Sequence, residues 1–222
     1  MKRWPLVPTV VVALAVAAMI GLGLWQLLDR RPEKLAYIAQ LASNPAKPPI
    51  KFPRVPNESL LFRRATGFCV EPNGIETRGA GAAGFRLIAE CRTGAEGPGM
   101  AVQLGTTTYP NPEFVWRRGE VRIRTGGTGA SGRTVWRGGK VQGYIVYKPD
   151  GRSSIEALLD GDDTPRRMML VLDQPAGQLA PNPRPDPSTV RNPHLSYAFQ
   201  WFFFATAAAV IYVLALRRRR VR

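Results

Sequence analysis

The chain has 222 residues, with 31 lysines and arginines against 16 aspartates and glutamates, which gives a formal net charge of +15. Seven of the basic residues lie at the two ends of the chain, outside two long apolar runs, and the other 24 are spread along the middle. This spread argues against nucleic-acid binding and favours anionic lipid headgroups or an anionic ligand as the partner.

The two apolar runs predict two transmembrane helices. Leu6 to Leu28 contains 23 residues without a charge, and Leu195 to Leu216 contains 22. About 20 apolar residues are enough for a helix to cross the hydrocarbon core of a bilayer. A cleaved signal peptide is disfavoured at the start, because the run is too long for a signal sequence and its Ala13-Leu14-Ala15 triplet lies inside it.

The charged flanks of these helices predict their orientation. Basic residues next to a membrane helix favour the cytoplasmic side, whereas long domains cross largely regardless of their charge. Lys2 and Arg3 precede the first run, and Arg217 to Arg220 follow the second. We therefore predict a cytoplasmic N-terminus (1–5), a first membrane helix (6–28), an outer β-rich domain with proline-rich connectors (29–193), a second membrane helix (195–216) and a basic cytoplasmic tail (217–222).

One face of the first run carries small residues four apart, ending at an aromatic: Ala13, Ala17, Gly21 and Trp25. Such a face lets a second helix approach closely in lipid. Alanine and glycine are also simply common in membrane helices, so the pattern leaves both interpretations open.

The middle of the chain has the signals of short strands. The predicted strands are rich in β-branched and aromatic residues and are bounded by glycine and proline: 65–70, 85–91, 100–104, 114–124, 134–147 and 167–172. One short helix is expected over 153–159, and 44–56 is expected to be an extended connector without a helix. Because no strand–helix–strand rhythm appears, we predict a mostly antiparallel sheet or small open barrel. The fold class is a membrane protein of α+β type, with two transmembrane helices flanking one mostly antiparallel β domain.

The chain has two cysteines, Cys69 and Cys91, and both fall in predicted strands. A domain outside the cytoplasm favours a disulfide between them. The alternative is a pair of buried, unpaired thiols. Neither a double Cys-x-x-Cys pattern nor a cysteine–histidine cluster is present to indicate zinc.

Enzyme chemistry has little support in the sequence. Residues 127–132 satisfy the pattern Gly-x-Gly-x-x-Gly, but a strand follows them where a dinucleotide site requires a helix, so a hairpin loop is the better interpretation. The acidic group Asp160, Asp162 and Asp163 is typical of a solvated turn. We predict that the protein is not an enzyme.

The single histidine lies where a proline-rich segment meets the second apolar run. On a helix, His194 shares a face with Tyr197 and Trp201. Histidine is a standard axial ligand of haem iron, and two aromatic rings offer stacking surfaces. Cations for the propionates of haem are available in the segments that flank both helices: Arg30, Arg31, Lys34 and Arg191. The alternative is an interfacial aromatic belt in which His194 only starts the helix.

Two motifs carry a family resemblance. Gly23-Leu24-Trp25-Gln26-Leu27, followed by Arg30 and Lys34, is similar to a G-x-W-Q…R…K signature, and residues 192–202 match N-x-H-x-x-Y-A-x-x-W-F. With the two terminal helices, these motifs resemble the surfeit locus protein 1 family, the assembly factors of cytochrome c oxidase. The chain departs from the family in one position near the first motif, because the arginine expected four residues after the tryptophan comes five residues after it, as Arg30. The middle domain matches only loosely.

The resemblance implies a bacterial inner-membrane protein with a periplasmic central domain that helps to build the haem a centres of the oxidase. It implies transient binding of haem a, with His194 as the candidate iron ligand and with contacts from Tyr197, Trp201, Trp25, Arg30 and Lys34. The implied partners are oxidase subunit I, haem a synthase and the lipid bilayer. The alternative is a membrane scaffold that stabilises partly assembled subunit I without binding haem. A third and weaker alternative is an envelope sensor whose outer domain binds a small anion.

Overall fold

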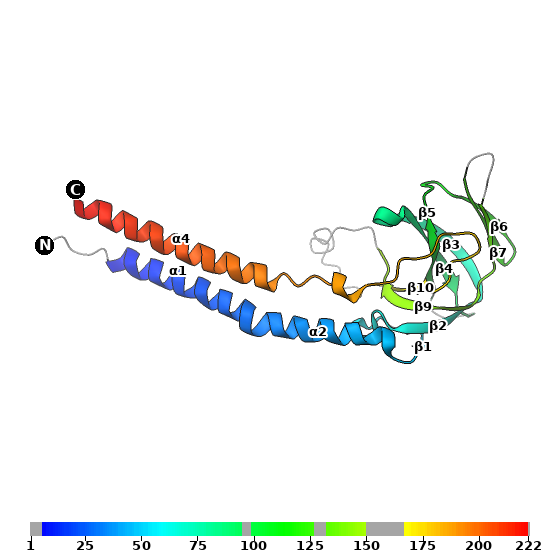
Figure 1. The fold of residues 1–222 in the computed structure, drawn as a ribbon, viewed down its shortest axis with the longest axis horizontal. Coiled ribbons are helices and arrows are strands. Elements are labelled where there is room, and N and C mark those ends of the chain that lie inside the picture. Colours follow the sequence, from blue (N-terminus) through cyan, green and yellow to red (C-terminus); the bar gives the residue numbers. More distant parts are fainter. Residues whose placement is uncertain (1–5, 95–98, 127–131, 150–166, 222) are drawn as a thin grey trace. The chain divides into compact units, whose positions relative to one another are not determined.

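The computed structural model describes residues 6–94, 99–126, 132–149 and 167–221, and the chain divides into two compact units (Figure 1). One unit combines Met1–Ala39 with Ser188–Arg222, and the other is Gln40–Pro187. The first unit is helical and the second is built around β-sheets. The predicted α+β class, with an apolar helix near each end of the chain, is confirmed.

The helices of the first unit are longer than the apolar runs predict. α1 (Leu6–Trp25) passes without a break into a π-helix, η1 (Gln26–Arg30), and then into α2 (Arg31–Ser43). α4 (His194–Val221) begins at the histidine and runs through the arginines. The helix continues past Leu28 and through Pro32, which follows directly after the π-helix in the first turn of α2.

α1 and α4 pack against each other as an antiparallel pair. Gly23 is buried, and a Cβ atom added to it would lie 2.5 Å from the ring of Phe202. Gly21 has nothing within 4 Å of such an atom, and Ala13, Ala17 and Trp25 are exposed. The small-residue face through Ala17 and Gly21, whose meaning the sequence left open, is therefore not the one that meets α4. The large ring of Phe202 decides this, because it needs the space above Gly23.

The β unit contains ten strands within the described residues: β1 (Ile50–Lys51), β2 (Arg64–Cys69), β3 (Glu71–Gly79), β4 (Phe85–Arg92), β5 (Met100–Thr107), β6 (Glu113–Arg117), β7 (Glu120–Thr125), β8 (Gly132–Trp136), β9 (Gly139–Tyr147) and β10 (Met168–Leu172). In this part of the chain they form a seven-stranded sheet in the order β1-β2-β9-β10-β5-β4-β3 and a three-stranded sheet β6-β7-β8. The β1–β2 and β10–β5 pairs are parallel and the other strand pairs are antiparallel, which confirms a mostly antiparallel sheet.

Two predicted strands are each two strands: β6 and β7 form a hairpin, whereas β8 and β9 belong to different sheets. The stretch 114–124 is β6 and β7, which turn at Gly119 (φ +70°), and 134–147 is β8 and β9, which are separated at Gly138 (φ +78°). Glycine adopts this left-handed backbone without strain. Each of the two glycines therefore ends one strand inside a stretch that the sequence analysis took as a single strand.

The structure also shows one strand that the sequence analysis did not predict, and it tests one of two further predictions. β3 was missed because it opens with the polar, proline-containing sequence Glu71-Pro72-Asn73. The connector 44–56 was predicted to be extended and free of helix; it contains the extended strand β1 but begins with a short 3-10 helix (Asn44–Ala46), which the prediction missed. The helix predicted over 153–159 lies outside the described residues.

The large sheet curls because consecutive strands lie near its opposite ends. β2 runs into β3 with only Val70 between them, although four other strands lie between the two in the strand order. The Val70 N–H donates to the Arg92 carbonyl (2.8 Å), and Cys69 forms a disulfide with Cys91 on β4. The fully buried residues Leu87, Ile88, Val102, Leu104, Ile145, Met169 and Leu170 make up most of the core of this curled sheet.

Candidate functional site

The single histidine of the chain faces a glutamine of the first helix. His194 starts α4, and its Nδ1 atom lies 2.7 Å from Oε1 of Gln26, the first residue of the π-helix. Tyr197 N–H donates to the Pro193 carbonyl (3.0 Å), which closes the first turn of α4 around the histidine. The two side chains therefore join the end of one membrane helix to the start of the other.

This hydrogen bond selects one form of the imidazole. The carbonyl oxygen of Gln26 can only accept, so Nδ1 of His194 is the donor. A neutral ring that carries its proton on Nδ1 has its lone pair on Nε2. Metal-binding histidines usually have one ring nitrogen held by such a polar partner while the other binds the metal. With Nδ1 bonded to Gln26, the lone pair of a neutral His194 ring is on Nε2.

The π-helix explains the departure at the first sequence motif. Its backbone is closed by the Arg31 N–H donating to the carbonyl of Gln26, five residues before it. In a π-helix each backbone hydrogen bond spans five residues instead of the four of an α-helix, so side chains five residues apart lie on the same face. The Arg30 guanidinium accordingly stacks over the Trp25 ring, 4.8 Å from its centroid. Arg30 thus regains the position beside the tryptophan that a spacing of four would give in an α-helix.

The remaining predicted residues have different environments. Lys34 Nζ lies 4.7 Å from the centroid of the Tyr37 ring, and Arg30 also pairs with Glu33 (3.0 Å). Tyr197 is exposed, whereas Trp201 is half-buried on the side of α4 that includes the buried Ala198. His194 and Trp201 therefore share the inward side of α4, and Tyr197 lies outside it.

A second polar contact crosses the helix pair far from His194. The Thr9 hydroxyl and the Tyr212 hydroxyl lie 2.6 Å apart, and both groups come from otherwise apolar stretches. Hydrogen bonds between helices in lipid are worth about 0.6 kcal/mol on average, with a maximum of about 1.7 kcal/mol. The Thr9–Tyr212 bond can hold the helices together but offers no metal ligand of the kind His194 offers.

The sequence analysis missed the role of Gln26. It is the one polar amide in the first apolar run. A polar side chain within a membrane helix normally faces another helix and bonds to it. That signal was present and would have directed Gln26 to a polar partner on the second helix, where His194 is an obvious candidate.

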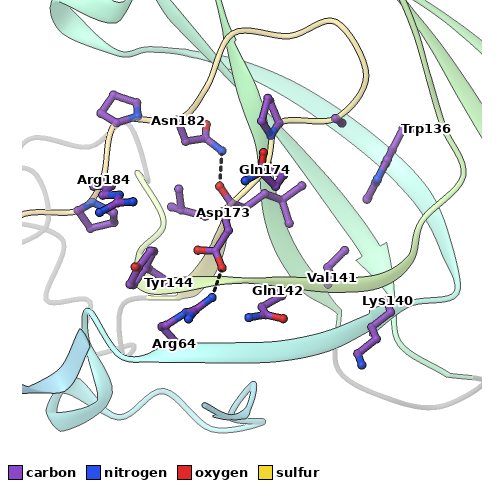
Figure 2. Close-up of a pocket in the computed structure, with 16 residues that line it drawn as sticks. Arg64, Trp136, Lys140, Val141, Gln142, Tyr144, Asp173, Gln174, Asn182 and Arg184 are labelled. Atoms are coloured by element: carbon purple, nitrogen blue, oxygen red, sulfur yellow. Dashed lines mark hydrogen bonds and ion pairs between the residues drawn. The ribbon is translucent and has the colours of Figure 1, made fainter. Parts of the chain in front are cut away.

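The β unit has a hollow of its own, of about 610 Å³, beside the carboxyl end of β10 (Figure 2). Arg64 of β2 reaches across it to Asp173 (2.7 Å), and this hydrogen bond, with the charge of Asp173, raises the pKa of the Arg64 guanidinium. Asn182 donates to the Leu172 carbonyl (3.1 Å) and holds the returning chain in place. The central charges of this hollow neutralise each other.

Neither a metal-binding group nor a dinucleotide-binding unit is found among the described residues. They contain no group of three or more histidine, cysteine, aspartate or glutamate side chains that could hold a metal ion. β7 and β8 are antiparallel neighbours on either side of the glycine-rich sequence, so a hairpin connection replaces the strand–helix unit of a dinucleotide site. Residues 127–131 and the acidic group 160–163 lie outside the described residues.

Comparison with known proteins gives one match. The model of the SURF1 family matches residues 13–206, which is most of the chain and includes both helix motifs. No curated protein and no solved structure matches the chain.

Proposed function

Because the chain belongs to the SURF1 family, which is associated with cytochrome c oxidase assembly, we propose that it binds haem a at the outer surface of a bacterial inner membrane and assists its insertion into oxidase subunit I. The family is one of assembly factors and not a known class of enzyme. In this proposal haem a is cargo that the protein receives and releases.

The observation that carries the proposal is the His194–Gln26 hydrogen bond. It occupies Nδ1 of the imidazole and leaves the Nε2 lone pair available to haem iron. The exposed rings of Trp25 and Tyr197 offer apolar surface at the same helix ends. Lys34 supports the proposal with a cation for a propionate, although its ammonium also lies over Tyr37. The residues present therefore fit the group.

A single histidine per chain suits a carrier. One imidazole supplies one axial ligand, so the second axial position depends on water, another residue or another chain. Binding through one protein ligand is weaker than binding through two and allows release. Haem a is apolar and poorly soluble, and a site at the membrane surface shields it until subunit I receives it.

The location follows from charge. The basic residues outside both helices favour the cytoplasm, which places the opposite helix ends, with Gln26 and His194, at the outer surface. In a bacterium this surface faces the periplasm, where the β unit and its disulfide would lie. Subunit I and haem a synthase are the partners that the proposal requires.

A scaffold is the second candidate, and the same hydrogen bond favours it. In that account His194 and Gln26 only join the helices, as Thr9 and Tyr212 do, and the helix pair supports partly assembled subunit I. Both accounts predict a folded helix pair. They differ in whether His194 has a role that Tyr212 lacks.

The test compares the two contacts directly. Wild type, His194→Ala and Tyr212→Phe are purified in mild detergent from cells that make haem a, and their absorption spectra are recorded at equal protein concentration. We expect a haem a spectrum in the wild type and in Tyr212→Phe, and its loss in His194→Ala at unchanged yield. The haem a content of the oxidase in the same cells should follow the same order. Colourless wild-type protein, together with normal oxidase in the His194→Ala cells, would favour the scaffold.

A further inference from the structure

Three neighbouring strands of the β unit place two lysines and a phenylalanine on one face of the sheet. Lys51 of β1 is in register with Thr66 of β2, and Phe68 of β2 is in register with Lys140 of β9. Side chains two residues apart on a strand share a face, and directly opposed residues do so too. Lys51, Thr66, Phe68 and Lys140 therefore share the outer face, where 59% of the Phe68 surface is exposed.

This face borders a hollow of about 830 Å³, distinct from the one in Figure 2. Its apolar lining includes Phe52, Phe68, Met100 and Met168, of which the two methionines are buried. Small-molecule sites are typically hollows of about 300–1,000 Å³ with a mostly apolar wall and a few convergent polar groups. The size and the wall of this hollow both fit that description.

The charged side chains among the described lining residues of this hollow are all positive. Its lining includes Lys51, Arg54 and Lys140, and no carboxylate is present among the described lining residues. Arg167 also lines it but pairs with Glu90 (3.1 Å), whereas within the described chain the other three cations form no ion pair. In the neighbouring hollow, by contrast, Arg64 is neutralised by Asp173. Unpaired cations around an apolar wall favour an anion that carries an apolar body.

We propose that this hollow binds an amphiphilic carboxylate, with its apolar body against Phe52 and Phe68 and its carboxylate between Lys51, Arg54 and Lys140. The site belongs to the β unit alone, so it does not depend on haem binding at His194. It gives the outer domain a ligand-binding role in addition to the role proposed for the helices.

The test measures binding of a small probe to the full-length protein in nanodiscs of zwitterionic lipid, with empty nanodiscs as the blank. The probe is 4-phenylbutyrate, which is water-soluble, and its binding is followed by ligand-observed NMR. Lys51→Gln combined with Lys140→Gln removes two cations from the hollow. Arg117→Gln combined with Arg118→Gln removes the same charge from the strand pair β6–β7, away from both hollows.

We expect saturable binding to the wild type and to the Arg117/Arg118 control, and at least about tenfold weaker binding to the Lys51/Lys140 variant. Phe68→Ala, which keeps every cation, should also weaken binding, and 4-phenylbutan-1-ol and 4-phenylbutylamine should bind poorly. His194→Ala should bind the probe as the wild type does. The proposal is overturned by the absence of saturable binding, by equal binding to the Lys51/Lys140 variant, or by equally tight binding of inorganic phosphate.

Discussion

The two units of the protein arrange polar and apolar side chains in opposite ways. In the β unit, apolar residues such as Leu87, Val102 and Ile145 are fully buried. In the helical unit, Leu14, Phe203 and Ile211 are each about two thirds exposed, while the polar side chains of Gln26 and His194 face each other between the helices. A surface that meets lipid favours apolar groups outside and satisfied polar groups inside.

This difference directs the search for function. In the β unit a buried polar group is one of many features of a water-soluble fold, and most charges lie at the surface. In the helical unit each polar side chain at the helix interface must have a specific partner, because lipid offers none. Gln26 and His194 therefore stand out, and the following predictions separate the contributions of the two units.

The largest effect on stability is expected from the disulfide, which belongs only to the β unit. Reduction of Cys69–Cys91, or replacement of both residues by serine, should lower the free energy of unfolding of this unit by about 3 kcal/mol. Denaturant unfolding followed in wild type and variant measures this. Haem binding by the helices should persist in the reduced protein under native conditions, and its loss would show that the two units do not act separately.

A bulky residue at Gly23 should separate the helix pair. Gly23→Leu would drive its side chain into the Phe202 ring and cost about 1–3 kcal/mol of helix packing, with a loss of haem at His194. Gly21→Leu is the matched control, because nothing lies within 4 Å of its new Cβ atom. Helix proximity is measured by cysteine cross-linking between α1 and α4. Equal effects of the two substitutions would contradict the packing of Gly23 on Phe202.

Loss of the Gln26 amide should weaken haem binding without abolishing it. In Gln26→Leu the imidazole loses the acceptor that holds its proton on Nδ1, and such partner groups are typically worth about 10- to 100-fold in metal affinity. Titration of the apoprotein with haem in detergent gives the affinity. Thr9→Val removes the interhelical hydrogen bond to Tyr212 and should leave the affinity unchanged.

Acidification should produce the smallest effect, again in the β unit. Burial of Glu76 raises its pKa, but the hydrogen bonds and charges of Lys148 and Arg78 outweigh this and hold its pKa below 4.5. A lowered folded-state pKa stabilises the protein above the unfolded value, and this contribution is lost as the pH falls through the folded value. Unfolding measured from pH 6 down to pH 3 should show a smaller loss of stability in Glu76→Gln than in wild type. Glu58→Gln, whose carboxyl lies outside this ion-pair cluster, serves as the control.

The sequence predicts the membrane helices and most strand positions well, because length and apolar periodicity alone determine them. It does not place the turns at Gly119 and Gly138, because the left-handed backbone that makes each turn is seen only in the structure. Nor does it indicate the π-helix, because one extra residue in a helical turn leaves no compositional mark. The sequence also leaves open which face of α1 meets α4, because small residues mark where a helix can approach and the position of Phe202 against Gly23 is seen only in the structure.

For the candidate site, the sequence identifies His194 but not the side chain that orients it. The motif contains Gln26, yet only the folded helix pair shows that its carbonyl oxygen meets Nδ1. The sequence also suggests Arg30 and Tyr197 as equal contributors. The structure instead shows Arg30 engaged by Trp25 and Glu33, and Tyr197 turned away from the helix interface.

Ligand rescue tests the central claim, that His194 Nε2 binds haem iron, most directly. His194→Gly removes the imidazole and leaves space for a free one beside Gln26. The account predicts that the purified variant lacks the haem a spectrum and regains it when haem a and millimolar imidazole are added together. A variant that binds haem a equally well without imidazole, or that gains nothing from it while remaining folded, would contradict ligation by His194.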